Sequence, residues 1–121
     1  MKTGSREELE PVCPFCGAKL ARPAAVKLSA VEEALGGTCR GCGAIYLVDP
    51  TNKNVGEVMM QTLGLAADKL AKDMSEMIAG QDYEDAVLNY DVRIHRSSGV
   101  NRGFADGHGR LYILKIKKQT V

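Results

Sequence analysis

The sequence predicts a small α+β protein, with a four-cysteine module first, a central amphipathic helix second and a C-terminal antiparallel β element last. Three observations support this prediction. All four cysteines fall in two Cys-x-x-Cys pairs, apolar residues recur at helical spacing over residues 55–78, and residues 110–118 are rich in apolar and aromatic side chains. A length of 121 residues fits one compact unit. We expect residues 11–50 and 54–121 to pack together within it.

The two cysteine pairs are Cys13-Pro-Phe-Cys16 and Cys39-Arg-Gly-Cys42, and Gly-Ala follows each of them. A tight Cys-x-x-Cys turn brings two thiolates to about 2.3 Å from one tetrahedral metal ion, and a second turn completes the coordination. Four protein ligands leave no position open for water or substrate. The pattern therefore predicts a structural metal site at Cys13, Cys16, Cys39 and Cys42.

The segments CPFCGAKL and GGTCRGCGAIYLV resemble the zinc-ribbon class with paired rubredoxin-type knuckles, over roughly residues 11–50. The resemblance implies one Zn²⁺ held by the four cysteines, with Gly17 and Gly43 as the knuckle glycines. Iron is a minor alternative because the ligand set alone does not fix the metal. Disulfides or a thioredoxin-like motif are disfavoured, since the chain shows no export signal and carries two matched pairs. The resemblance says almost nothing about biological role.

Between and after the pairs, local signals predict short elements. Ser29-Ala-Val-Glu32 has the pattern of a capping box, which predicts a short helix that Gly36-Gly37 would end. The run from Ile45 to Val48 predicts a strand, and the turn that begins at Asp49-Pro50 would end it.

The central segment is predicted to be one amphipathic helix that Asn54 caps and that continues to Ile78, with Gly80 as its C-cap and Gly64 as a place where it bends or breaks. Its polar face is acidic, and it holds four of the five methionines, Met59, Met60, Met74 and Met77. Methionines fill cores more often than they line adaptable binding surfaces. A core role is therefore favoured, and a face for a protein partner or a homodimer stays open.

Further short elements are predicted beyond the helix. Asp82 is expected to cap a second short helix over residues 83–89, and the alternation over residues 91–96 predicts a strand. Ser97-Ser98-Gly99 predicts a turn. A segment around residues 103–105 is expected to pair as a hairpin with the strong strand at 110–118.

The net charge of +1 conceals an uneven distribution, because residues 57–89 carry 2 basic and 7 acidic side chains and residues 90–121 carry 7 and 2. Cations on a strand face, interleaved with aromatics, can hold a nucleic-acid backbone. The more common role of such cations is to protect an edge strand from aggregation. The candidate residues for nucleic-acid binding are Arg93, His95, Arg110, Lys115 and Lys117.

The sequence contains no recognisable nucleophile motif, P-loop or second ligand cluster, so we expect no enzymatic activity. Its apolar runs are too short to cross a membrane, and we expect a cytoplasmic protein. Two functional hypotheses remain for a zinc-binding protein of this kind. One is a regulatory or accessory factor associated with nucleic acid, and the other is a protein-interaction or structural module that uses the acidic methionine-bearing helix.

Overall fold

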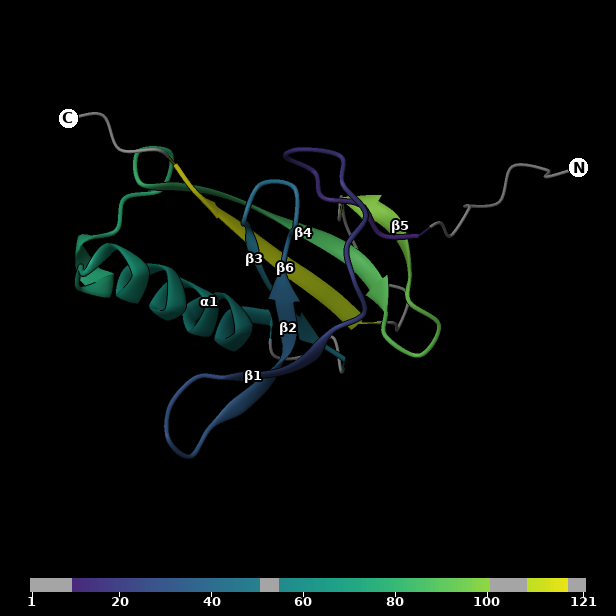
Figure 1. The fold of residues 1–121 in the computed structure, drawn as a ribbon, viewed down its shortest axis with the longest axis horizontal. Coiled ribbons are helices and arrows are strands. Elements are labelled where there is room, and N and C mark those ends of the chain that lie inside the picture. Colours follow the sequence, from purple (N-terminus) through teal and green to yellow (C-terminus); the bar gives the residue numbers. More distant parts are fainter. Residues whose placement is uncertain (1–9, 51–54, 101–108, 118–121) are drawn as a thin grey trace, which may run out of the picture.

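The computed structural model describes residues 10–50, 55–100 and 109–117. The α+β class is confirmed, with the cysteines near the N-terminus, the helix central and further strands towards the C-terminus (Figure 1). The elements are β1 (Ala24–Lys27), β2 (Glu33–Thr38), β3 (Ile45–Asp49), α1 (Val55–Leu70), the 3-10 turn η1 (Met74–Glu76), β4 (Tyr83–Asp91), β5 (Arg96–Val100) and β6 (Gly109–Ile116).

The strands form one antiparallel six-stranded sheet in the order β1-β2-β3-β6-β4-β5. Strand β6 inserts between β3 and β4, pairing Leu114 with Ile45 on one side and Ile116 with Tyr83 on the other. The region that contains the cysteines therefore shares its sheet with the C-terminal part of the chain. The strand predicted at 45–48 is confirmed as β3, and the strand predicted at 110–118 is confirmed over residues 110–116 as β6. Lys118 lies outside the described residues.

The central strands β3 and β6 are buried on both faces, because successive side chains of a strand point to opposite sides. One face packs against α1, and it presents Ile45, Leu47, Tyr112 and Leu114. The opposite face packs against the cysteine segment, and it presents Tyr46, Val48, Leu111 and Ile113. The molecule is thus built as three layers, a helix, a sheet and the cysteine segment.

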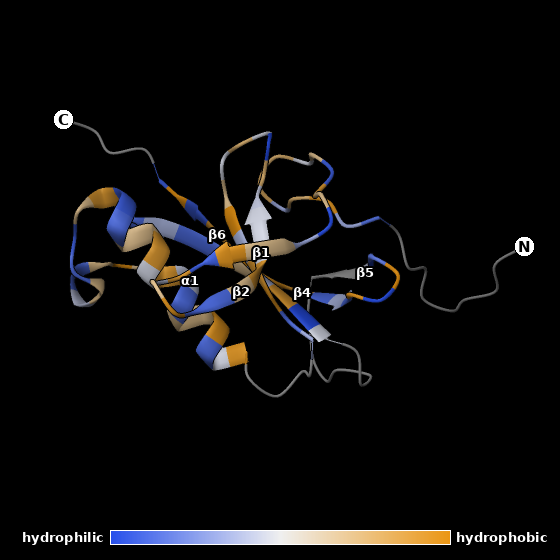
Figure 2. Cartoon of the chain, turned by 60° about the horizontal axis from the view of Figure 1, so that its bottom comes forward, coloured by the Kyte–Doolittle hydropathy of each residue, from blue (hydrophilic) through white to orange (hydrophobic). Residues whose placement is uncertain are grey.

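Helix α1 is shorter than the sequence predicted, since it ends at Leu70 rather than at Ile78. Ala71 takes a left-handed φ of 55°, and the amide of Lys72 donates to the carbonyl of Ala67 at 2.9 Å, which closes the last turn. Gly64 does not break the helix, because α1 continues through it. Orange and blue alternate along α1, as expected for a helix with one apolar face (Figure 2).

The prediction of a short helix that begins at Ser29 is wrong, because β1 and β2 form a hairpin there. The local hydrogen bond of the predicted cap does form: Ser29 Oγ accepts from the amide of Glu32 at 3.2 Å, but it closes the hairpin turn. Gly36 does not end a helix either. A Cβ at this position would lie 2.1 Å from the carbonyl oxygen of Tyr46, so the glycine permits close approach of β2 to β3.

The prediction of a helix over residues 83–89 is wrong, because this segment is the first part of β4. Asp82 is buried and accepts from the amide of Ile78 at 2.8 Å instead of capping a helix. Gly80, expected to be a helix C-cap, lies with φ +85° in the turn before β4. Eight register pairs with β6 override the local helical pattern.

The strand predicted over residues 91–96 is also wrong. Strand β4 ends at Asp91, residues 92–95 form a turn in which His95 has φ 55°, and the predicted turn at Ser97-Ser98-Gly99 belongs to β5. The predicted hairpin segment at 103–105 lies outside the described residues. None of the described helices is long and apolar enough to span a membrane.

Candidate metal centre

The first Cys-x-x-Cys pair forms a tight knuckle. The amide of Gly17 donates to the carbonyl of Cys13 at 2.8 Å, and the amide of Cys13 donates to the carbonyl of Ala18 at 2.8 Å. The amide of Phe15 points at Cys13 Sγ across 3.4 Å. A left-handed φ of 81° at Gly17 turns the chain back, as glycine does without a steric penalty.

The second knuckle repeats this geometry between β2 and β3. The amide of Gly43 donates to the carbonyl of Cys39 at 2.8 Å, and the amide of Cys39 donates to that of Ala44 at 2.7 Å. The amide of Gly41 lies 3.4 Å from Cys39 Sγ, and φ is 83° at Gly43. The repeat seen in the sequence is therefore also a structural repeat, predicted by the CxxCG pattern alone.

At the third residue of the motif, the difference between the two knuckles reflects their close approach. Gly41 occupies the place that Phe15 has in the first knuckle. A Cβ at Gly41 would lie 2.7 Å from Cys16 Sγ and 2.9 Å from Ala18 Cβ. A side chain there would push the knuckles apart, so the glycine sets the distance between the cysteine pairs.

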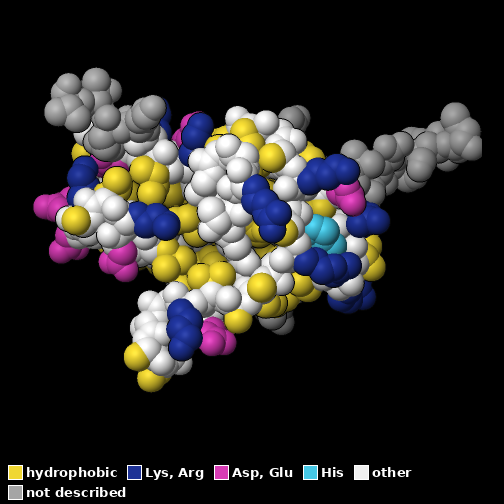
Figure 3. Space-filling view, viewed as in Figure 1, with side chains coloured by type: hydrophobic (Ala, Val, Ile, Leu, Met, Phe, Trp, Pro, Cys, Tyr) yellow, Lys and Arg dark blue, Asp and Glu magenta, His cyan; other side chains and the backbone are white. Residues whose placement is uncertain are grey.

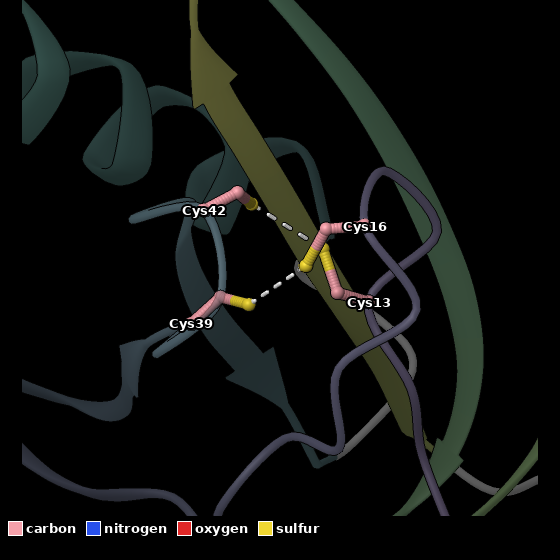
Figure 4. Close-up of side chains that lie close together, drawn as sticks. All are labelled: Cys13, Cys16, Cys39 and Cys42. Atoms are coloured by element: carbon pink, nitrogen blue, oxygen red, sulfur yellow. Dashed lines mark hydrogen bonds between the residues drawn. The ribbon is translucent and has the colours of Figure 1, made fainter.

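The four cysteine side chains converge from the two knuckles on one point (Figure 4). Their sulfur atoms all lie within 4.8 Å of one another. The distance is 3.6 Å from Cys13 Sγ to Cys42 Sγ and 3.5 Å from Cys16 Sγ to Cys39 Sγ. Sulfurs at the corners of a tetrahedron with metal–sulfur bonds of about 2.3 Å are about 3.8 Å apart. The arrangement fits a single four-coordinate metal ion.

The cluster lies at the edge of the apolar layer beneath it. Cys13 and Cys39 are buried, whereas Cys16 is exposed and Cys42 is half-buried. Burial is the largest influence on the Cys13 thiol and raises its pKa to about 12. Burial also raises the pKa of Cys39, but the amides of Cys42 and Gly41 and the neighbouring sulfurs outweigh it and lower that pKa to about 7. Without metal, the Cys13 and Cys39 thiols therefore differ in acidity.

The residues that follow the first knuckle, Leu20 and Ala21, are held against the sheet by polar contacts. Tyr46 donates its hydroxyl to the carbonyl of Ala21 at 2.8 Å. His95 Nε2 lies 2.9 Å from the carbonyl oxygen of Leu20, and its Nδ1 lies 2.6 Å from the hydroxyl of Tyr90. Sequence reasoning missed these anchors, because the partners are far apart along the chain and only the fold brings them together.

The cations predicted to share one strand face do not converge. Arg93 and His95 lie in the turn between β4 and β5, where Arg93 forms a two-pronged ion pair with Asp91, 2.8 Å between the closest atoms. Lys115 and Lys117 lie at the opposite end of β6. Lys117 Nζ donates to the carbonyl of Gly80 at 2.8 Å.

Arg110 is buried at the start of β6, with 7% of its surface exposed. It pairs across the sheet with Asp49 on one side and Asn89 on the other. These three residues form a polar row at the α1 side of the sheet, so Arg110 is not presented to solvent as a surface cation.

A different group of cations surrounds His95. Figure 3 shows dark blue Lys and Arg side chains gathered around the cyan histidine, which is His95 among the described residues. The pKa of Glu10 is lowered mainly by its contact with Lys19 at 3.0 Å, and also by Arg96 and His95. Lys19 and Arg96 both lie near Glu10, and Arg22 lies near Tyr90. We call Lys19, Arg22 and Arg96 the cationic cluster.

No family model, curated protein or solved structure matches this chain significantly. The class of the site is therefore defined by its own geometry. It is a cluster of four cysteines at metal-binding distance, built from two equivalent knuckles and backed by the apolar face of a sheet.

Proposed function

We propose that this protein binds one Zn²⁺ through Cys13, Cys16, Cys39 and Cys42, and that the ion has a structural role. The observation that supports this most directly is the convergence of the four sulfurs within 4.8 Å. Zn²⁺ suits four thiolates in a tetrahedral arrangement, and a closed coordination sphere leaves no open position for catalysis. Iron, which accepts the same ligands, is the alternative. In this proposal the protein is not an enzyme.

The ion would fasten the cysteine segment onto the sheet. Cys13 and Cys39 belong to the apolar layer formed with Tyr46, Leu111 and Ile113. The metal would therefore stabilise this side of the protein's core as well as the two knuckles. Binding of structural zinc contributes on the order of 10 kcal/mol to folding in small zinc modules. We expect strong chelators to unfold at least residues 11–50.

Metal analysis of the purified protein tests this proposal. We expect one zinc per chain and no visible absorption, whereas an iron centre would be coloured. Substitution by Co²⁺ should give the absorption bands of a tetrahedral thiolate site, and Cys16→Ser should weaken Co²⁺ binding although Cys16 is exposed. Lys27→Ala, on β1, serves as the control. Dispersed amide signals for residues 11–50 after complete metal removal would contradict the structural role.

The cationic cluster favours a second candidate function, contact with the backbone of a nucleic acid. Lys19 and Arg22 follow the first knuckle, and Arg96 joins them from β5. Cations gathered on one side of a molecule bind phosphates through release of counterions, so binding should fall steeply as salt increases. We expect Arg22→Ala to weaken binding of single-stranded RNA or DNA and to reduce the salt slope by about one. Lys69→Ala on α1 is the control. Absence of binding at low salt would refute this candidate.

A further inference from the structure

A groove of about 430 Å³ runs between the β1–β2 hairpin and helix α1. The hairpin extends away from the rest of the sheet beside α1 (Figure 1). The groove does not include the cysteines or the cationic cluster. The lining residues that matter for its chemistry are Leu28, Glu32, Met60, Leu65, Asp68 and Met74.

The floor of the groove is apolar and adaptable. Leu28, Leu65 and Met74 are half-buried and pack against the core beneath α1. Met60 is 56% exposed, which is a large apolar surface for a side chain that borders a cavity. Methionine is flexible and polarisable, so it adjusts to apolar side chains of different shapes. Gly64 presents no side chain to the floor, and the nearest atom to a Cβ there would be Met74 Sδ at 3.4 Å.

The rim of the groove is acidic. Glu32 stands on the hairpin side, and Asp68 and Asp73 stand on the helix side, all three exposed. The lining includes one cation, Lys72, and its ammonium is paired with Asp82 at 2.9 Å. Within the described parts of the chain, no ion pair engages Glu32, Asp68 or Asp73. The groove therefore presents uncompensated negative charge around an apolar floor.

We propose that this groove binds a basic amphipathic peptide segment of a partner protein, with an apolar side chain on the Met60 and Leu65 floor and Lys or Arg side chains at the acidic rim. The volume is in the range of ligand-binding clefts in proteins. An amphipathic segment laid in an apolar groove is a common mode of peptide recognition, and complementary charge would orient the segment. The proposal is independent of the metal, and its failure would leave the zinc proposal unaffected.

Titration of the zinc-loaded, isotope-labelled protein with three synthetic peptides of equal length tests this proposal. One peptide is built from Lys and Leu, one from Glu and Leu, and one from Lys and Ser. The Lys/Leu peptide is expected to shift the amide signals of Met60, Gly64 and Asp68, and the other two are not. Equal binding of the Lys/Ser peptide would overturn the proposal, because it would need no apolar floor. Equal binding of the Glu/Leu peptide would overturn it as well, because charge would then play no part.

Two pairs of variants on α1 locate the site. Met60→Lys should weaken binding of the Lys/Leu peptide at least tenfold, about 1.4 kcal/mol, whereas Met59→Lys, at an exposed neighbour outside the groove, should leave it unchanged. Asp68→Asn should weaken binding, whereas Glu57→Gln should not. Equal effects of Met59→Lys and Met60→Lys would overturn the proposal. So would self-association on sedimentation that Met60→Lys abolishes, because a second copy of the chain would then be the occupant.

Discussion

His95 Nε2 lies 2.9 Å from the carbonyl oxygen of Leu20, which joins the β4–β5 turn to the chain directly after the first knuckle. A carbonyl oxygen can only accept, so Nε2 carries the hydrogen. When the ring is neutral, its Nδ1 then accepts from the hydroxyl of Tyr90 at 2.6 Å. The ring also meets that of Tyr90 edge-on, with centroids 5.6 Å apart. This histidine therefore links the sheet to the cysteine segment without any metal.

Removal of this link should destabilise the zinc-loaded protein by about 1–3 kcal/mol, because a buried hydroxyl loses its partner. His95→Asn is the appropriate variant, since asparagine tolerates the φ of 55° at this position better than most residues. Denaturant unfolding of the zinc-loaded protein measures the effect. Stability equal to that of the parent protein would contradict a stabilising role for the His95 link.

Gly36→Ala should destabilise the protein by about 1–3 kcal/mol or more. The added Cβ would lie 2.1 Å from the carbonyl oxygen of Tyr46 and 2.5 Å from Leu47 Cδ2, so β2 and β3 must separate. Gly56→Ala is the matched control, because nothing lies within 4 Å of a Cβ at that position of α1. Thermal or denaturant unfolding of both variants compares them, and equal stabilities would contradict the close approach of the strands.

Ala71→Gly should stabilise the protein by about 0.5–1 kcal/mol. Ala71 closes α1 with φ 55°, a left-handed conformation that costs an alanine energy and costs glycine none. The variant should leave the hydrogen bond from Lys72 to Ala67 intact. The free energy of unfolding in denaturant measures the change. A loss of stability would mean that the helix does not end at this residue.

Stability of the zinc-loaded protein should fall as the pH rises above 10. Burial raises the pKa of Tyr90 from about 10 to about 12, and burial with a hydrogen bond to Asp85 raises the pKa of Tyr112 further. The native state then holds these protons more tightly than the unfolded state, so their contribution is fully present below pH 10 and is lost above it. Unfolding curves from pH 9 to 12 follow this loss. Tyr90→Phe should have a smaller pH dependence than the parent protein.

Zinc binding at neutral pH should release protons, and the apparent affinity should rise with pH. The metal binds thiolates, and burial raises the pKa of the Cys13 thiol to about 12, so this thiol holds its proton until the ion displaces it. Calorimetric titration in two buffers of different ionisation enthalpy counts the protons. Binding without proton release would show that the metal-free cluster is already fully ionised.

Local sequence signals predicted the parts of the site that are local in the structure. A Cys-x-x-Cys turn followed by glycine closes on itself through hydrogen bonds within six residues, as between Cys13 and Ala18. The same kind of signal misled at Ser29, where its hydroxyl accepts the expected amide hydrogen bond but closes a hairpin. A cap and a tight turn satisfy the same backbone groups, so the pattern at Ser29 does not choose between them.

Strand pairing between distant segments was not predictable in this way. The helical pattern of residues 83–89 gives way to β4 because β6 supplies a complete hydrogen-bonding partner along it. The cations predicted to act together are separated for the same reason, since β6 places Arg110 in the interior and Lys115 at the far end of the sheet. The groove and the cationic cluster likewise combine segments that no periodicity connects.

The sequence by itself specified the candidate metal ligands, because the identity, number and spacing of the cysteines supply four sulfur atoms in two knuckles. Only the tertiary structure decided where these ligands lie in the protein. It placed the knuckles against the face of the sheet opposite α1, so that Cys13 and Cys39 are part of the core. The physical reason is the range of the interactions: a knuckle closes over a few residues, whereas the sheet forms only when β6 pairs between β3 and β4.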